Sequence, residues 1–335
     1  MARAVPDNAL PLHVAETAQM TKENVMAQVF VTGGSGFIGQ VLVRRLTSEG
    51  HTVRALVRSE NSAAAVDALG AVPVRGDLTE PDGWREGLAG SEVIFHLAAE
   101  TDITAERERH DAVTVRGTRA VVEAARQANV SRFIHCGSEA ALLAGDPLIE
   151  VDESEPLRPD SEAAYCAAKA AAEKIVLDAS GPGFDTLAIR PRFVWGPGSI
   201  LIESLVAAAR AGQFAWIDGG RHITDVTYVD NAVEGLMRGW QHGRPANAYF
   251  VTDQHRVVLR EFLRPLFDAY GVGVPVPEMD AQTAAREVPV PARWFLGQPC
   301  TLRADKATAQ LGYRPLVSHT DGLDAVAKSL AGNGA

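Results

Sequence analysis

Four glycines follow a short apolar segment near the start of the chain. The segment VFVTGGSGFIG, residues 29–39, holds Gly33, Gly36 and Gly39 in the spacing GxxGxxG, and residues of helical period come next. In a strand–turn–helix unit, one glycine permits the tight turn, one lets backbone amides approach a pyrophosphate, and one allows the helix to pack closely on the strand. We therefore expect a dinucleotide-binding βαβ unit. The alternative is a glycine turn that only connects two elements.

Short apolar runs alternate with longer segments of helical period up to residue 190. Such alternation predicts an α/β fold, namely a Rossmann-type doubly wound parallel sheet. Strands are predicted at 28–32, 52–57, 72–74, 92–97, 132–137 and 185–190, and helices at 37–49, 111–128 and 161–179.

The character of the chain changes after residue 190, where RPRFVWGPGS is rich in proline, glycine and aromatic residues. We expect a dinucleotide-binding domain over 27–190 and a smaller, partly interleaved substrate-binding lobe over 191–335, while residues 1–26 form an extension in which Met26 is an alternative start. The Pro-rich segment 271–300 is interpreted as a loop around the substrate. The second lobe is predicted to contain strands at 214–217 and 248–251 and helices at 200–211, 230–240 and 258–269.

Charge and composition argue against several classes of function. The formal net charge of −10 disfavours a nucleic-acid surface, which needs clustered Lys and Arg. No apolar run approaches the roughly 20 residues of a membrane span, so we expect a cytoplasmic protein that does not bind membranes. No metal site is predicted, because the cysteines and histidines lack ligand spacing, and His96 is interpreted as structural. The residues considered are Cys136, Cys166, Cys300, His96, His135 and His222.

The end of the second predicted strand bears on the choice of cofactor. Sites for NAD usually place Asp or Glu there to bind the ribose 2′-hydroxyl, whereas this chain has Val57 followed by Arg58. A cation in place of the acid favours NADP(H), although NAD(H) stays open if Arg58 is only a surface residue and Glu60 takes the acidic role. Asp77, just past the third strand, suits hydrogen bonding to the adenine or capping of a helix.

Three residues suggest proton-transfer chemistry. Tyr165 and Lys169 are four apart on a predicted helix and share a face, where an ammonium would lower the pKa of the phenol. The tyrosine could then donate or accept a proton near neutral pH. Ser138 follows the fifth predicted strand, at the sheet edge where ligands bind, and would hydrogen-bond the reacting oxygen; a turn or cap role is its alternative.

These motifs resemble, in order and over roughly residues 27–330, the extended short-chain dehydrogenases/reductases, the NAD(P)-dependent epimerase/dehydratase group. The nearest branch is that of the 3β-hydroxysteroid dehydrogenases and dihydroflavonol reductases, by the segments VRALVR and RPRFVWGPG. The resemblance implies that Tyr165 is the general acid/base, that Lys169 binds the nicotinamide ribose, and that Ser138 orients the carbonyl. The matching motifs are TGGSGFIG, GDL, HLAA, CGS, YxxxK, WGPG and YVDN, and the expected cofactor contacts are Gly33, Ser35, Gly36, Phe37, Ile38, Gly39, Arg58, Asp77, Leu78, Ala98, Tyr165, Lys169, Pro191 and Val194.

Two positions depart from the family pattern. Thr114 stands where an Asn is usual, and that Asn is mainly a scaffold and solvent-relay residue. Thr224 stands where nucleotide-sugar enzymes have an Arg that binds the diphosphate, which disfavours such a substrate. A compensating Arg221 or Arg303 keeps the nucleotide-sugar alternative open.

The expected reaction is the NADP(H)-dependent interconversion of a carbonyl and an alcohol on an apolar, aromatic, alicyclic or steroid-like molecule. A nucleotide-sugar epimerase or dehydratase with bound NAD is the first alternative, and a non-catalytic dinucleotide sensor is the second. We also expect a homodimer formed through helices within 100–128 and 161–179. The predicted substrate contacts are Ser138, Phe193, Trp195 and Tyr228, drawn from a wider aromatic set with Phe214, Trp216, Trp294 and Phe295.

Overall fold

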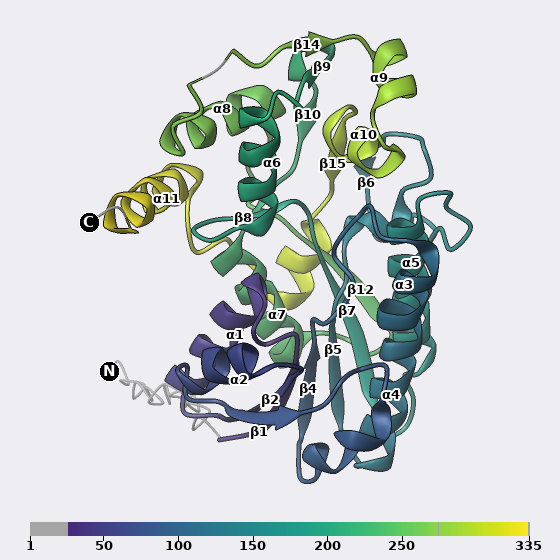
Figure 1. The fold of residues 1–335 in the computed structure, drawn as a ribbon. Coiled ribbons are helices and arrows are strands. Elements are labelled where there is room, and N and C mark those ends of the chain that lie inside the picture. Colours follow the sequence, from purple (N-terminus) through teal and green to yellow (C-terminus); the bar gives the residue numbers. More distant parts are fainter. Residues whose placement is uncertain (1–25, 274, 334–335) are drawn as a thin grey trace, which may run out of the picture.

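The computed structural model describes residues 26–273 and 275–333, so most of the predicted extension lies outside the described residues. Its centre is a parallel sheet of seven strands in the order β12-β7-β5-β4-β1-β2-β3. This arrangement confirms the predicted doubly wound fold (Figure 1). The strands are β1 (Gln28–Thr32), β2 (Thr52–Val57), β3 (Val72–Arg75), β4 (Val93–His96), β5 (Arg132–Cys136), β7 (Asp185–Pro191) and β12 (Asn247–Val251).

Helices cover both faces of this sheet (Figure 1). One apolar layer joins the sheet to α1 (Phe37–Ser48) and α7 (Val229–His242), and another joins it to α4 (Gly117–Gln127) and α5 (Ala164–Asp178). The central strands are buried from both sides, which explains their nearly continuous apolar sequences. The helix predicted at 111–128 starts earlier, as α3 (Arg107–His110), and passes through a π-helical segment, Asp111–Arg116, into α4. Helix α2 (Glu60–Asp67) follows β2.

One predicted strand belongs to a different sheet from the one expected. The sequence places 248–251 in the second lobe, but β12 pairs in parallel with β7 at the edge of the main sheet. Helix α7 likewise packs on that sheet. The chain therefore returns to the first layer after entering the second, because pairing partners depend on burial across the whole fold and not on local pattern.

The second lobe consists of short strands and three helices around an aromatic core. A four-stranded sheet has the order β13-β10-β15-β6, and two further pairs are β11 with β8 and β14 with β9. The strands are β6 (Leu148–Val151), β8 (Val194–Trp195), β9 (Trp216–Ile217), β10 (Ile223–Thr224), β11 (Thr227–Tyr228), β13 (Val257–Val258), β14 (Glu278–Met279) and β15 (Cys300–Leu302), and the helices are α6 (Ile200–Arg210), α8 (Leu259–Ala269) and α11 (His319–Asn333).

The Pro-rich segment 271–300 is more ordered than the predicted loop. It contains β14 and two short helices, α9 (Ala281–Glu287) and α10 (Val290–Leu296). Trp294 is buried in a cluster beside the Tyr165 ring, and the neighbouring Phe295 is only partly buried. A proline accepted at the first turn of α10 explains why the composition is compatible with a helix.

Two negative findings concern the residues that the structure describes. None of their helices is both long and apolar enough to cross a membrane. Nor do they contain a cluster of His, Cys, Asp or Glu side chains that could hold a metal ion.

Candidate active site

The glycine turn between β1 and α1 leaves no room for side chains. Gly33 has φ +73°, and a Cβ there would lie 2.7 Å from the amide nitrogen of Ala98. A Cβ on Gly39 would lie 2.0 Å from the carbonyl oxygen of Gly33. Gly36 begins α1 without any side-chain cap, and the first turn of the helix carries no acidic residue. Uncapped amides at a helix N-terminus favour an anion, so the turn fits the diphosphate of a dinucleotide.

The other predicted residues of this turn lie around it. Ser35 is partly exposed, and its carbonyl accepts a hydrogen bond from Gln40 at 2.9 Å. Phe37 and Ile38 pack against the core of the second lobe, so the two lobes meet at the start of α1. Ala98 follows β4, and its amide donates to Thr32 Oγ1 at 3.3 Å.

The carboxyl ends of β2 and β3 hold the residues that were expected to select the cofactor. Arg58 is exposed, and Glu60 forms an ion pair with Arg75, so Glu60 is already engaged by a cation. Asp77 Oδ1 accepts hydrogen bonds from the amide and hydroxyl of Thr79. Burial acts to raise the pKa of Asp77, but those hydrogen bonds and the Arg58 charge leave it lowered. The adjacent Leu78 is buried in the core.

Ser138, Tyr165 and Lys169 come together at the carboxyl edge of the sheet. Ser138 follows β5 and caps a 3₁₀ turn, Glu139–Leu142, where its Oγ accepts from the Ala140 amide at 3.2 Å. Tyr165 lies in the first turn of α5 and hydrogen-bonds with Ser138. Lys169, one turn later, places its Nζ 5.9 Å from the centre of the Tyr165 ring. Ser138 therefore caps the 3₁₀ turn, which was its alternative role, and also lies beside Tyr165.

The electrostatics around Tyr165 differ from the sequence-based expectation. Burial, followed by the charge of Glu139, raises the pKa of Tyr165. Burial also lowers the pKa of Lys169. The four-residue spacing does not by itself acidify the phenol, because desolvation outweighs the ammonium across this distance. In this environment Tyr165 keeps its proton, and the raised pKa makes the phenol a weaker acid.

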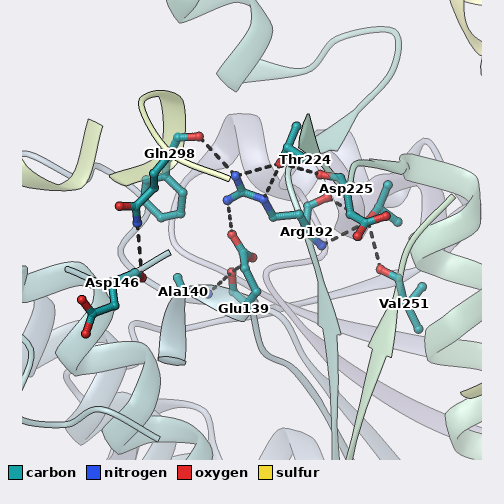
Figure 2. A network of polar contacts seen from close by, with 11 residues as sticks. Glu139, Ala140, Asp146, Arg192, Thr224, Asp225, Val251 and Gln298 are labelled. Atoms are coloured by element: carbon teal, nitrogen blue, oxygen red, sulfur yellow. Dashed lines mark hydrogen bonds and ion pairs between the residues drawn. The ribbon is translucent and has the colours of Figure 1, made fainter. Parts of the chain in front are cut away.

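Two buried ion pairs flank Ser138, and sequence reasoning missed both. Arg192 pairs with Glu139 at 2.5 Å, and Arg190 pairs with Glu173 at 2.5 Å. Figure 2 shows the first pair and its contacts with Thr224. Arginines at 190 and 192 point to the same side of an extended segment because strand side chains alternate. Charged residues inside the otherwise apolar GSEAALL and AIRPRF runs are the signal that could have revealed them.

Hydroxyl groups hold the scaffold behind the site. Thr114, which replaces the usual Asn, accepts a hydrogen bond from the Glu100 amide at 3.0 Å through its Oγ1. His96 is fully buried between Thr32 Oγ1 at 2.7 Å and Thr118 Oγ1 at 2.9 Å. These contacts confirm the structural interpretation of His96 and show how a threonine can take a scaffold position.

The position expected to recognise a diphosphate is closed. Thr224 is buried, and its hydroxyl accepts from the Arg192 guanidinium. Arg221 is exposed near Glu278, and Arg303 lies between Asp152 and Asp305. Arg303 borders a polar surface cavity of about 710 Å³ that does not include Tyr165. Among the described residues, the ion-pair partners of Arg221 and Arg303 are these acidic side chains, and neither arginine bonds to Thr224.

Three aromatic residues expected to line a substrate pocket lie in the core of the second lobe. Trp195 is fully buried and donates its indole N–H to Asp253 at 2.9 Å, while Tyr228 packs against the Trp195 ring. Phe193 is also buried and contacts Phe262. Apolar packing accounts for the places of these rings, and their contact with a substrate stays a prediction. Phe193 has φ +44°, an unusual conformation for a non-glycine residue.

The backbone around that residue still reaches the sheet edge. Pro191 ends β7, and Val194 begins β8 and is only partly buried. Both were expected to contact the nicotinamide, and their position immediately after a central strand is compatible with that expectation.

Two other rings contact Tyr165 from outside α5. Phe295 lies edge-on with ring centroids 6.0 Å apart, and His110 lies edge-on at 5.8 Å. His110 is buried, and burial lowers its pKa. Phe295 belonged to the wider aromatic set considered from the sequence, but His110 did not. It lies more than 50 residues before Tyr165, so no local spacing connects the two.

Comparisons with known proteins agree with this geometry. The model of the 3-beta hydroxysteroid dehydrogenase/isomerase family matches residues 30–277. The chain is 41% identical to a 4-hydroxy-2-methyl-3-oxo-4-farnesyl-3,4-dihydroquinoline-1-oxide ketoreductase of Stigmatella aurantiaca, over 92% of this chain and 98% of that protein. It is 34% identical to a 3-beta-hydroxysteroid dehydrogenase of Mycolicibacterium neoaurum, over 75% of this chain and 72% of that protein.

Solved structures share the fold at lower identity. A UDP-glucose 4-epimerase of Thermotoga maritima, solved with UDP-glucose, superposes with a TM-score of 0.77 at 19% identity, over 92% of this chain and 100% of that one. A dTDP-glucose 4,6-dehydratase of Streptomyces venezuelae, solved with NAD, gives 0.75 at 24%, over 91% and 97%. These likenesses show that the chain shares the fold of both proteins.

Proposed function

Since the chain belongs to the 3-beta hydroxysteroid dehydrogenase/isomerase family, and is therefore an oxidoreductase acting on carbonyl and alcohol groups, we propose that it reduces a ketone on an apolar small molecule, with Tyr165 as the proton donor. The observation that carries the proposal is the meeting of Ser138, Tyr165 and Lys169 at the sheet edge that also presents the glycine turn.

The residues that would hold the cofactor are distributed along this edge. Amides of the turn after β1 would bind its diphosphate, Lys169 its nicotinamide ribose, and the backbone from Pro191 to Val194 its nicotinamide. When bound, the cofactor supplies a hydride to the carbonyl carbon. Glycines rather than side chains form the turn, which leaves its amides accessible.

The chain's own groups would manage the oxygen of the substrate. Tyr165 holds a proton because its pKa is raised, and it would give that proton to the oxygen as negative charge develops there. Hydride at carbon and proton at oxygen together make the alcohol. Ser138, hydrogen-bonded with Tyr165, would fix the position of the phenol.

NADP(H) is the proposed form of the cofactor. Arg58 is exposed at the end of β2 and has no carboxylate next to it in sequence except Glu60, which pairs with Arg75. An exposed guanidinium at this place would bind a 2′-phosphate more strongly than a 2′-hydroxyl.

An apolar substrate is supported by the relatives' names and by the closed diphosphate position. The relatives named above are a quinoline ketoreductase and a steroid dehydrogenase. A third, 30% identical over 88% of this chain and 97% of its own length, is a 2-alkyl-3-oxoalkanoate reductase of Stenotrophomonas maltophilia.

A nucleotide-sugar epimerase or dehydratase is the second candidate, since those structures share the fold. The hydroxyl of Thr224, held by Arg192, weighs against it.

A homodimer through the α4 and α5 layer also remains a proposal. Most alanines of α5 that suggested close helix packing are buried within this one chain, including Ala168, Ala170 and Ala172. Any dimer would use the outer face of that helix, and a solution mass measurement would detect it.

The test is a spectrophotometric assay of NADPH oxidation with acetophenone, cyclohexanone and androstenedione, in parallel with UDP-glucose. We expect turnover with at least one ketone, and the Tyr165→Phe variant should lose about a hundredfold or more of it while still binding NADPH. Full activity in the variant would refute the role of Tyr165. Binding of NADPH with no ketone reduced would favour the sensor alternative, and consumption of UDP-glucose would favour the epimerase.

A further inference from the structure

Glu139 uses both of its carboxylate oxygens. Oε1 accepts from Arg192 Nη1 at 2.5 Å, and Oε2 accepts from Ser138 Oγ at 2.7 Å. The side chains of Glu139 and Arg192 are 2% and 0% exposed, so water does not compete for these bonds. Because a carboxylate can only accept, the hydroxyl hydrogen of Ser138 points to Glu139. The serine therefore presents its oxygen, and not its proton, to its other neighbours.

Arg192 extends this contact into the second lobe. Its Nε and Nη2 donate to Thr224 Oγ1 at 3.4 and 3.2 Å, and Nη2 also donates to the carbonyl of Phe295 at 3.2 Å. Figure 2 shows Arg192 between Glu139 and Thr224. The Phe295 ring contacts Tyr165, so the polar chain from Ser138 through Glu139 and Arg192 ends at a residue on the far side of the phenol.

Stability alone does not account for such a pair. A buried ion pair loses hydration on both sides, and an apolar pair of similar size is often as stable. The second pair, Glu173 with Arg190, offers an internal comparison: it is equally buried, and its arginine lies two residues before Arg192. Among the residues that the structure describes, Glu173 makes no hydrogen bond with Ser138 and instead accepts from Arg190 Nε and Nη2.

We propose, on the basis of the function proposed above, that Glu139 is a positioning residue for the reduction: held by Arg192, it orients the Ser138 hydroxyl beside Tyr165 and couples this pair to the Phe295 segment of the second lobe. Tyr165 is then the proton donor to the substrate oxygen, since the Ser138 proton is engaged by Glu139.

Several charged and titratable groups surround Tyr165, and a test must distinguish the effect of Glu139 from the effects of the others. Glu139, Cys166 and Cys136 act to raise its pKa, after burial itself. Lys169 lies near the ring on the same helix, and His110 faces it from α3. Among these groups, Glu139 combines a charge with a direct bond to Ser138. Its neutral replacement should therefore change the surroundings of Tyr165.

The experiment compares Glu139→Gln with Glu173→Gln in the full chain, with tyrosine isotopically labelled at Cζ. The Tyr165 resonance is assigned by its loss in Tyr165→Phe, and its chemical shift is compared among the variants at neutral pH. We expect the chemical shift to change in Glu139→Gln, because the charge that holds Ser138 beside the phenol is lost. Glu173→Gln, which breaks an equally buried pair, should not change it. Reduction of a ketone that the wild type accepts should fall about tenfold in Glu139→Gln alone.

Two results would overturn the proposal: a Tyr165 chemical shift that is the same in Glu139→Gln and wild type, or an equal change in Glu173→Gln. If Glu139→Gln does not fold, Glu139→Asp keeps the charge but withdraws it from Ser138, and it must slow reduction more than Glu173→Asp does. The NMR comparison requires no turnover. If the wild type reduces no ketone, the proposed function is refuted, and the NMR result still decides whether Glu139 acts on Tyr165.

Discussion

The backbone of Gly39 lies against that of Gly33, so that a Cβ at residue 39 would come within 2.0 Å of the Gly33 carbonyl oxygen. The glycine turn and the first helical turn of α1 are in direct backbone contact, so moving one displaces the other. Gly39→Ala should therefore destabilise the fold by about 1–3 kcal/mol and weaken NADPH binding at least tenfold. Urea unfolding and calorimetry measure the two effects. Gly83→Ala is the matched control, because no atom lies within 4 Å of its added Cβ.

Arg58 is expected to distinguish the two nicotinamide cofactors. Replacing Arg58 by Ala removes the cation that follows β2, and the affinity for NADPH should fall about tenfold while that for NADH stays nearly unchanged. Fluorescence titration with each cofactor measures this. Arg119→Ala, an exposed arginine on α4, serves as the control. An equal loss of both cofactors would show that Arg58 does not read the 2′-phosphate.

Trp195 is expected to act through stability and not through substrate contact. Trp195→Phe removes the indole donor from Asp253, a buried carboxylate that also accepts from the Tyr228 amide and Asn231. The free energy of unfolding should fall by about 1–3 kcal/mol, with KM for the ketone unchanged. Trp240→Phe, whose ring makes edge contacts with Phe95 and His51, should cost less. A raised KM with unchanged stability would restore Trp195 to the substrate site.

Acid should destabilise the protein through His96. Burial, and then the charge of Lys169, lowers the pKa of His96 from 6.5 to about 3. Below pH 6.5 the unfolded chain binds a proton that the folded chain does not, so stability falls as the pH drops from 6.5 towards 3, by up to about 1.4 kcal/mol per pH unit. His135, stacked on His96 and also lowered in pKa, acts in the same direction.

Urea unfolding at several acidic pH values checks this slope. His96→Asn keeps polar groups between Thr32 and Thr118 but cannot take up the proton, so its stability should depend less steeply on pH. An unchanged slope would mean that other groups dominate acid unfolding.

Much of the fold and part of the site were predictable from local pattern. The glycine spacing, the apolar runs of β1 to β5 and β7, and the Tyr165–Lys169 spacing act over a few residues, where backbone conformation and side-chain direction follow from the covalent chain. The order of these motifs was enough to indicate the family. Thr224 was singled out as a departure from the family pattern, although its bond to Arg192 was not foreseen.

Only the tertiary structure decided which distant groups meet. The pairing of β12 with β7, the burial of Trp195, and the contacts of His110 and Phe295 with Tyr165 join segments separated by many residues. The same is true of Glu139 and Arg192, which lie 53 residues apart in the sequence. Inside the protein each loses its hydration water and is bound by the other instead. Desolvation depends on everything that surrounds a group, which is why the raised pKa of Tyr165 could not be deduced from a spacing of four residues.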